Sequence, residues 1–231
     1  MKRIVLEGPG KNAMSTALME RTRDAIRAAG DEALLLTGAG DAFSAGLDLK
    51  EIVSLDASGM SRFLGVLEDL VEALYLHPGP TVAFVNGHAI AGGCVLALAC
   101  DVRVMTARQG ARIGLNEVAL GLEFPPRTFA MVRDRLTKPA LERVILEAAL
   151  YDASTAKELG IVHAIGDEEG AKESLAILAS HPRATYAYAK GVLRASLAVP
   201  EDEAKRFRDV TVPAWAAPAL KDKLRAVLTR R

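Results

Sequence analysis

Two features in the middle of the chain could do chemistry on a carbonyl compound: glycines that come before a helix, and an isolated carboxylate. Gly92 begins an apolar, helix-like segment, where free backbone N–H groups carry partial positive charge and can bind a polarised oxygen. Gly46 lies in a second glycine-rich loop, where the backbone can approach a ligand closely. Two such amides that converge on one carbonyl oxygen would form an oxyanion hole. Ordinary tight turns use the same residues, so both interpretations stand at this point.

The isolated carboxylate is Glu117, the only acidic residue between Asp101 and Glu123. Its neighbours in the sequence are apolar: Ile113, Leu115, Val118, Ala119 and Leu120. If these residues bury the carboxylate, the loss of hydration raises its pKa and suits it to proton transfer. The alternative is a glutamate in an exposed surface loop, and the sequence does not decide between the two.

The elements that would position these residues alternate between strands and helices. Apolar runs predict strands at 4–7, 33–37 and 161–165, a glycine-rich loop at 38–49, and a strand, turn, helix and second strand within 82–122. Helical spacing predicts helices at 15–29, 60–76, 126–136, 138–150, 154–159, 168–179, 182–197 and 201–229, the last interrupted by Pro213 and Pro218. His77, just after the second helix, is predicted to lie on the surface. The alternation indicates an α/β fold with a C-terminal helical appendage.

Composition excludes several classes of protein. The chain has 231 residues, enough for one sizeable domain, and its 29 basic and 29 acidic side chains leave no positive surplus for nucleic acid. Cys94 and Cys100 have neither zinc-ligand nor redox spacing, so we expect small buried apolar residues and no metal site. The loop GAGDAF has Phe43 at the place where a dinucleotide-binding fingerprint needs its third glycine, so the sequence does not favour a dinucleotide site there. Without a secretory signal or a membrane span in the sequence, we predict a cytoplasmic protein with no membrane contact.

Two segments at a consistent distance carry a family resemblance. FSAGLDLKE, starting at Phe43, and NGHAIAGGCVLALACD, starting at Asn86, resemble the signature of the crotonase (enoyl-CoA hydratase/isomerase) superfamily. The similarity runs from roughly residue 8 to 165. The resemblance implies an α/β fold with a crotonase-like spiral ββα core. It also implies an acyl-coenzyme A thioester as substrate, and we expect no other cofactor.

The resemblance also implies roles for individual residues. The two amides that hold the thioester oxygen correspond to the N–H groups of Leu47 and Gly92. The pantetheine and nucleotide would lie along a segment that contains Ala45, Gly46, Asp48, Leu49 and Lys50. The segment IGLNEVALGL, residues 113–122, is similar to the corresponding segment of the Δ3,Δ2-enoyl-CoA isomerases in this superfamily. In those enzymes an Asn-Glu pair holds the substrate and supplies the base. Asn116 is therefore expected to contact the substrate, and Glu117 to act as base and acid.

A departure from the family pattern reduces the number of reactions that the chain could catalyse. Hydratases of this family use two glutamates, and the position of the first, three residues after Gly92, is Val95 here. Valine cannot transfer a proton or orient water, whereas the second position is occupied by Glu117. A single carboxylate suits the isomerisation of a 3-enoyl-CoA to a 2-enoyl-CoA. Glu123 remains a possible second acid, and otherwise is a polar residue at a turn.

Two rival functions stay open. The first is another crotonase reaction, such as hydration, hydrolysis or dehalogenation, with Glu123 or a backbone-held water. The second is an acyl-CoA-binding homologue without catalytic activity. The resemblance further implies a homotrimer or a dimer of trimers. We therefore divide the chain into an acyl-CoA-binding core, 1–180, and a helical region, 181–231, for oligomer contact and pocket closure.

Overall fold

Two parallel sheets form the centre of the protein in the computed structural model, which describes residues 1–194 and 197–229. The larger sheet has the strand order β1-β2-β4-β6-β8 (Lys2–Leu6, Leu34–Gly38, Thr81–Val85, Val102–Met105 and Ala164–Ile165). The smaller sheet has the order β3-β5-β7 (Ala42–Ser44, His88–Ile90 and Ile113–Gly114). Strands β3, β5 and β7 follow β2, β4 and β6 along the chain, so the backbone repeats the same two-strand step three times. This repetition is the predicted spiral.

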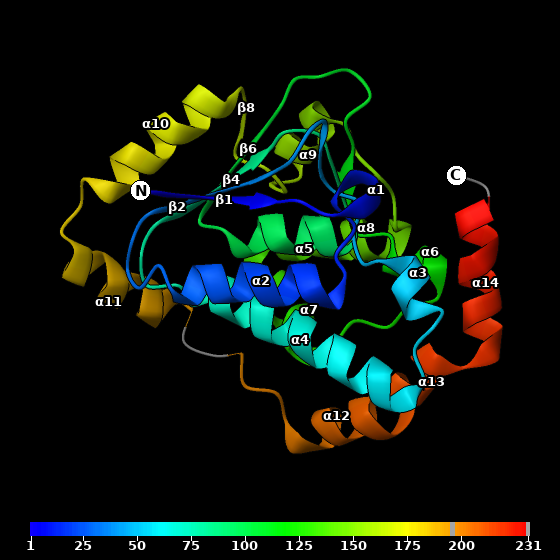
Figure 1. Cartoon of the computed structure of the whole chain (residues 1–231). Helices are drawn as coiled ribbons and strands as arrows, with labels where there is room; N and C mark the ends of the chain where they lie inside the picture. Colours follow the sequence, from blue (N-terminus) through cyan, green and yellow to red (C-terminus); the bar gives the residue numbers. More distant parts are fainter. Residues whose placement is uncertain (195–196, 230–231) are drawn as a thin grey trace.

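Helices cover both faces of the larger sheet. Helices α2 (Thr16–Arg27), α4 (Ala57–Tyr75) and α5 (Gly92–Ala99) lie on one side of it, and α10 (Glu168–Ala179) lies on the other (Figure 1). The side chains of adjacent strand residues point to opposite faces. Leu36 accordingly belongs to the main core with α2, α4 and α5, whereas Leu35 packs with the buried side of α10. Coverage of both faces explains why the strands read as continuous apolar runs.

Polar caps set the start of two helices that the sequence predicts closely. The Ser15 side chain accepts a hydrogen bond from the Leu18 N–H at the start of α2, and Asp167 accepts one from the Gly170 N–H at the start of α10. Smaller helices connect the remaining elements: α1 Pro9–Asn12, α3 Leu49–Ile52, α6 Glu117–Leu120, α7 Pro126–Arg135, α8 Lys138–Glu147 and α9 Ala153–Glu158. None of the described helices is both long and apolar enough to cross a membrane.

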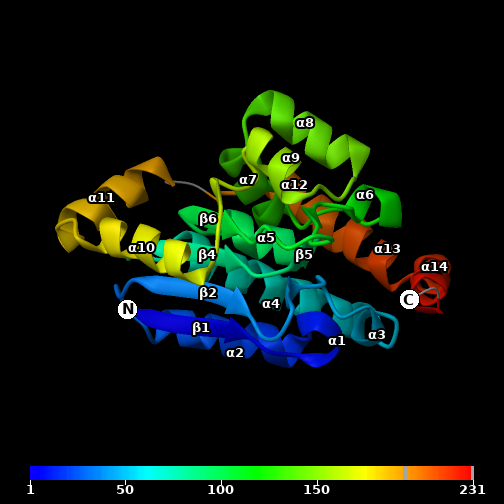
Figure 2. The same ribbon diagram turned by 90° about the horizontal axis from the view of Figure 1, so that it is seen from above.

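The C-terminal region folds back over the core. It consists of α11 Arg183–Leu193, α12 Glu201–Arg206, a π-helical turn Phe207–Thr211, α13 Val212–Ala216 and α14 Pro218–Thr229. Helix α13 packs against α4, and α14 packs against α3 at the far end of the molecule from α10 and α11 (Figures 1 and 2). Trp215 and Leu224 are buried by this packing. The division between 180 and 181 remains a prediction.

Two sequence predictions about local structure were wrong because distant contacts decide them. The predicted loop 38–49 contains strand β3, which is short and exists because it pairs with β5 more than forty residues later. His77, predicted to lie on the surface, is only 3% exposed. Its Nε2 atom lies 2.7 Å from the carbonyl oxygen of Glu32. Neither partner is near in sequence.

The prolines of the last helical stretch behave differently from each other. The backbone remains helical through Pro213, so the predicted interruption there was wrong. Pro213 comes just after the π-helical turn, and Thr211 and Val212 before it keep helical backbone angles. The interruption at Pro218 is confirmed, since the preceding Ala217 is extended, with φ −65° and ψ 141°.

Candidate active site

The two glycine loops predicted to form an oxyanion hole lie directly against each other. Gly46 has φ +90°, and a Cβ atom there would lie 2.7 Å from the carbonyl oxygen of Ile90 and 3.5 Å from the nitrogen of Gly92. A Cβ atom on Gly92 would lie 2.3 Å from Met14 Cε and 3.5 Å from Leu47 Cδ2. A side chain at Gly46 would meet backbone, whereas one at Gly92 would require the end of the Met14 side chain to move. The glycines therefore allow the backbones at Leu47 and Gly92 to lie close together.

The N–H groups of Leu47 and Gly92 are available to a ligand. Met14 pairs with this loop through two hydrogen bonds, from its N–H to the Gly46 carbonyl at 2.8 Å and from the Asp48 N–H to its carbonyl at 3.0 Å. These bonds use the groups on either side of the Leu47 N–H, which itself donates to none of the described residues. Gly92 is the first residue of α5, so its N–H precedes the first hydrogen bond of the helix.

The residue before Gly92 holds an uncommon backbone conformation. Ala91 has φ 50° and ψ −120°, which alanine rarely adopts. Its N–H donates to the carbonyl of Gly114 at 2.9 Å, which ties the loop to strand β7. The same strand leads within three residues to Glu117. The three strands of the smaller sheet therefore bring the two glycine loops and the carboxylate to one place.

Glu117 is buried, which excludes the surface-loop alternative. Its side chain is 7% exposed, it makes no salt bridge with the described residues, and its Oε2 atom has no hydrogen-bond partner among them. Burial raises the pKa of this carboxyl to about 8. The backbone N–H at the start of α6 opposes the shift only in part. Such a carboxyl can both take up and release a proton near neutral pH.

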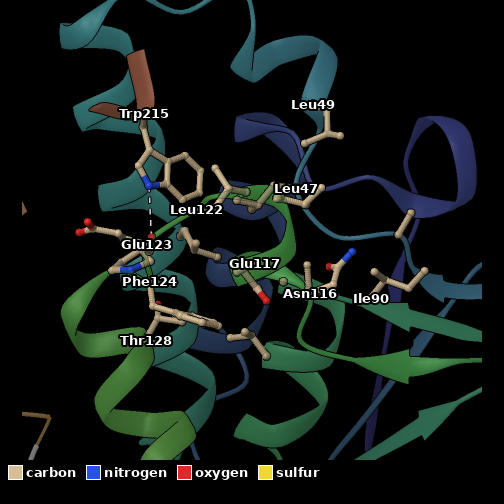
Figure 3. A pocket seen from close by; sticks show the side chains of 17 residues that line it. Leu47, Leu49, Ile90, Asn116, Glu117, Leu122, Glu123, Phe124, Thr128 and Trp215 are labelled. Carbon is tan, nitrogen blue, oxygen red and sulfur yellow. Dashed lines mark hydrogen bonds between the residues drawn. The ribbon is translucent and has the colours of Figure 1, made fainter. Parts of the chain in front are cut away.

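A largely apolar pocket joins these groups. It has an empty volume of about 580 Å³. Its wall contains Ala45, Leu47, Leu49, Leu67, Ile90, Ala91, Gly92, Val95, Asn116, Glu117, Leu120, Leu122, Glu123, Phe124, Pro125, Thr128 and Trp215. In Figure 3, Leu47, Ile90 and Asn116 lie on one side of Glu117, and Phe124, Thr128 and Trp215 lie on the other. A molecule that fills the pocket would pass the carboxylate.

Val95, which occupies the position of the first glutamate in hydratases of this family, faces the pocket. Val95 is 1% exposed and forms part of the wall. Asn116 also contributes, and its Oδ1 atom is buried without a hydrogen-bond partner among the described residues. The pocket thus has one free carboxylate, one free amide oxygen and an apolar side chain at the place of the other acid.

The structure argues against Glu123 as a second acid. Its carboxylate is half exposed and bound by Arg206, whose Nη1 lies 2.8 Å from Oε2, and by the Thr211 hydroxyl at 2.7 Å. These hydrogen bonds lower the pKa of Glu123. The carboxylate is therefore ionised and engaged near neutral pH. Its backbone carbonyl accepts a hydrogen bond from Trp215 Nε1 at 3.2 Å.

The segment expected to lie along the pantetheine borders a second cavity, with an empty volume of about 1030 Å³. The two cavities share Ala45, Leu47 and Leu49, and Asp48 and Lys50 line only the larger one. The Asp48 side chain is already used, because it caps α3 by accepting the N–H of Lys50 at 2.9 Å. The predicted site residues other than Gly46, which packs against Ile90 and Gly92, thus line these two cavities, although the Asp48 side chain is held by the backbone of α3.

Sequence reasoning missed two polar side chains of the pocket wall, Thr128 and Trp215. Both lie on helices that were predicted as helices, but no local signal shows which helical residues face a pocket formed with other elements. The buried hydroxyl of Thr128 and the indole of Trp215 are visible only once α7 and α13 have been placed against the core.

The parallel spiral of strand pairs, with a buried carboxylate beside two glycine loops, is the arrangement that the crotonase resemblance predicts. Comparison with known proteins agrees: the family model described as enoyl-CoA hydratase/isomerase matches residues 1–213. The chain therefore belongs to the enoyl-CoA hydratase/isomerase family, within the crotonase superfamily.

Curated relatives include proteins named for both reactions. A Thermus thermophilus protein described as a candidate enoyl-CoA hydratase is 38% identical over 72% of this chain and 66% of its own length. Enoyl-CoA delta isomerase 1 of Rattus norvegicus mitochondria is 32% identical over 55% of this chain and 44% of its own length. The matches thus span between about half and two thirds of these relatives. They leave the reaction of this chain unassigned.

Solved structures confirm the predicted fold. Human mitochondrial delta3-delta2-enoyl-CoA isomerase superposes with a TM-score of 0.85 at 24% identity, over 99% of this chain and 93% of that one. An enoyl-CoA hydratase from Bacillus halodurans superposes with a TM-score of 0.82, also at 24% identity, over 97% and 95%. At this identity the similarity shows the fold alone. The α/β crotonase fold with C-terminal helices is nevertheless established.

Proposed function

We propose that the chain is an isomerase that moves the double bond of a 3-enoyl-CoA to the 2-position, with Glu117 as its single proton-transfer group. The observation that carries this proposal is the pairing of a buried, unpartnered Glu117 with an apolar Val95 in the same pocket wall. Hydration in this family needs two acids. Here the pocket offers one, because the other nearby carboxylate, Glu123, is bound by Arg206 and Thr211.

The proposed reaction uses one carboxylate twice. The Glu117 carboxylate takes a proton from C2 of the 3-enoyl thioester, and the electron pair moves into the thioester carbonyl to give a dienolate. The N–H groups of Leu47 and Gly92 stabilise the negative charge on that oxygen. The protonated Glu117 then delivers the same proton to C4, and the double bond forms between C2 and C3. Atoms and charge balance without a cofactor or metal.

The surroundings of Glu117 support this use. A base acts most efficiently when its pKa lies near the working pH, and burial brings the pKa of Glu117 to about 8. The unpartnered Oδ1 of Asn116 supports its proposed role as a substrate contact. Segment 45–50 borders the larger cavity, where we place the pantetheine and nucleotide of coenzyme A. The trimer or dimer of trimers expected from the family belongs to the same proposal.

Replacement of Glu117 by glutamine tests the proposal. Glutamine keeps the shape of the side chain but cannot move a proton, so the variant should isomerise a 3-enoyl-CoA about 10²–10⁴-fold more slowly. The measurement is the formation of 2-enoyl-CoA by the purified protein, together with acyl-CoA affinity, which should change little. Full activity in Glu117→Gln would exclude the assignment.

The matched control is Glu123→Gln, the same chemical change six residues later. Because the Glu123 carboxylate contacts Arg206 and Thr211 and not a reacting atom, this variant should isomerise at nearly the wild-type rate.

The product that the wild type forms from 2-enoyl-CoA distinguishes the rival functions: a 3-hydroxyacyl-CoA would identify a hydratase. Binding of both thioesters without any product would identify a non-catalytic homologue.

A further inference from the structure

Thr128 places a hydroxyl in the pocket wall that the proposed reaction does not use. The residue is 1% exposed, and its Oγ1 atom has no hydrogen-bond partner among the described residues. A buried hydroxyl left unpaired costs about 1–3 kcal/mol. Three buried side-chain atoms of the described pocket wall lack a hydrogen-bond partner, and those of Asn116 and Glu117 have roles in the proposed function. The hydroxyl of Thr128 has none.

The place of Thr128 in the pocket indicates which part of a substrate it would meet. In Figure 3, Glu117 lies between Leu47 on one side and Thr128, with Phe124, on the other. The proposed function puts the thioester carbonyl at Leu47 and Gly92, and the reacting carbons at Glu117. The acyl carbons beyond C4 then extend toward Thr128 and Trp215. The following inference rests on that proposed function.

The chemistry around the hydroxyl restricts its partner. Among the described residues, no lysine, arginine or histidine lines the pocket, so a carboxylate or phosphate at this end would be buried without a counter-ion. Glu117 would in addition repel an anion when it is ionised. A neutral oxygen needs only a hydrogen bond, and the threonine hydroxyl can donate to a carbonyl or accept from a hydroxyl.

We propose that Thr128 determines specificity by hydrogen bonding to a neutral oxygen, a hydroxyl or carbonyl group, carried by the acyl chain beyond C4. A plain hydrocarbon chain at this place would displace water from the hydroxyl and leave it unpaired. An oxygenated chain replaces the lost hydrogen bond. The preferred substrate is therefore an oxygen-bearing acyl-CoA.

Matched pairs of saturated CoA thioesters test this proposal. Each pair compares a terminal hydroxyl with a methyl group of similar size: 5-hydroxypentanoyl-CoA with hexanoyl-CoA, and 6-hydroxyhexanoyl-CoA with heptanoyl-CoA. Calorimetry on the full chain should show that at least one hydroxylated member binds about fivefold more tightly than its partner, as one net hydrogen bond of about 1 kcal/mol implies. Thr128→Val should bind the methyl member at least as tightly. Thr128→Ser should keep the wild-type preference.

Two results would overturn the proposal. One is equal binding of every pair by the wild type, or tighter binding of the methyl members, which would mean that the hydroxyl holds only water. The other is an unchanged preference in Thr128→Val. The wild-type comparison decides by itself if the valine variant does not fold. Saturated thioesters cannot isomerise, so this binding test is independent of whether the chain is an isomerase.

Discussion

Two glutamates six residues apart show how the surroundings of a residue set its chemistry. Burial raises the pKa of Glu117 to about 8. Hydrogen bonds from Arg206 and Thr211 lower the pKa of Glu123, which is half exposed. The first is therefore suited to exchange protons and the second to remain charged and hold the C-terminal region. Sequence alone left both as candidate acids, because neither the burial of one nor the partners of the other are local.

The raised pKa of Glu117 makes folding stability depend on pH. Between its ordinary value of 4.5 and its folded value of about 8, the unfolded chain is ionised while the folded chain keeps the proton. The folded state then binds more protons, so the stabilisation from this group is complete below pH 4.5 and declines as pH rises through that range. The decline is about 1.4 kcal/mol per pH unit, an order-of-magnitude figure.

Urea unfolding at pH 5 and pH 7 measures this effect. Glu117→Gln lacks the ionisable group, so its stability should exceed that of the wild type by more at pH 7 than at pH 5. The difference between the two pH values should be about 2–3 kcal/mol. Identical pH dependence in the two proteins would show that Glu117 is not buried as described. Isomerase activity should rise over the same range, because the ionised form is the base.

At the scale of elements, the sequence predicts what local contacts determine. Helices α2 and α10 begin beside the capping residues Ser15 and Asp167, and the apolar runs mark β2 and β4. The short strands of the smaller sheet escape prediction, since a strand such as β3 has three residues and depends on a partner elsewhere in the chain. The two glycine loops and Glu117 could be singled out only because they lie in sequence motifs that resemble those of a known family.

Helix α11 is attached to the core by a buried charge cluster that sequence reasoning also missed. The Asp101 carboxylate pairs with Lys190 Nζ at 2.8 Å and with Arg194, and it accepts a hydrogen bond from the Tyr186 hydroxyl at 2.9 Å. Burial alone would raise the pKa of Asp101, but the two cations outweigh it and lower the pKa. Lys190 lies in α11 and Arg194 follows its last residue, and both are about ninety residues from Asp101 in sequence.

Replacement of Asp101 by asparagine should therefore destabilise the fold strongly. Lys190 and Arg194 are 7% and 5% exposed and would lose the carboxylate that compensates their burial. We expect a loss of about 3–5 kcal/mol in the free energy of unfolding, measured in urea.

Asp31→Asn is the matched control, because Asp31 also pairs with a cation of α11, Arg183, at 3.2 Å. That pair is exposed to solvent, so its loss should cost at most about 1 kcal/mol. Equal losses for the two variants would contradict the account of α11 as a helix held by a buried cluster.

On the scale of the whole molecule, the pocket belongs to two parts of the chain that are distant in sequence. The wall from Ala45 to Thr128 comes from the spiral core, and Trp215 comes from α13. Glu123 joins them, since its carbonyl accepts the Trp215 indole N–H while its carboxylate binds Arg206. The role of the C-terminal region in subunit contacts remains a prediction, which the mass of the protein in solution would test.

The indole of Trp215 gives the protein an intrinsic optical probe. It is the only tryptophan of the chain, so all tryptophan emission reports on the pocket wall. When an acyl chain replaces water beside the ring, the emission maximum should move to shorter wavelength in proportion to occupancy. Coenzyme A without an acyl group should leave the maximum unchanged, and a shift with coenzyme A alone would contradict this account. Ligand affinity can then be measured by intrinsic fluorescence, without labels and before any reaction has been assayed.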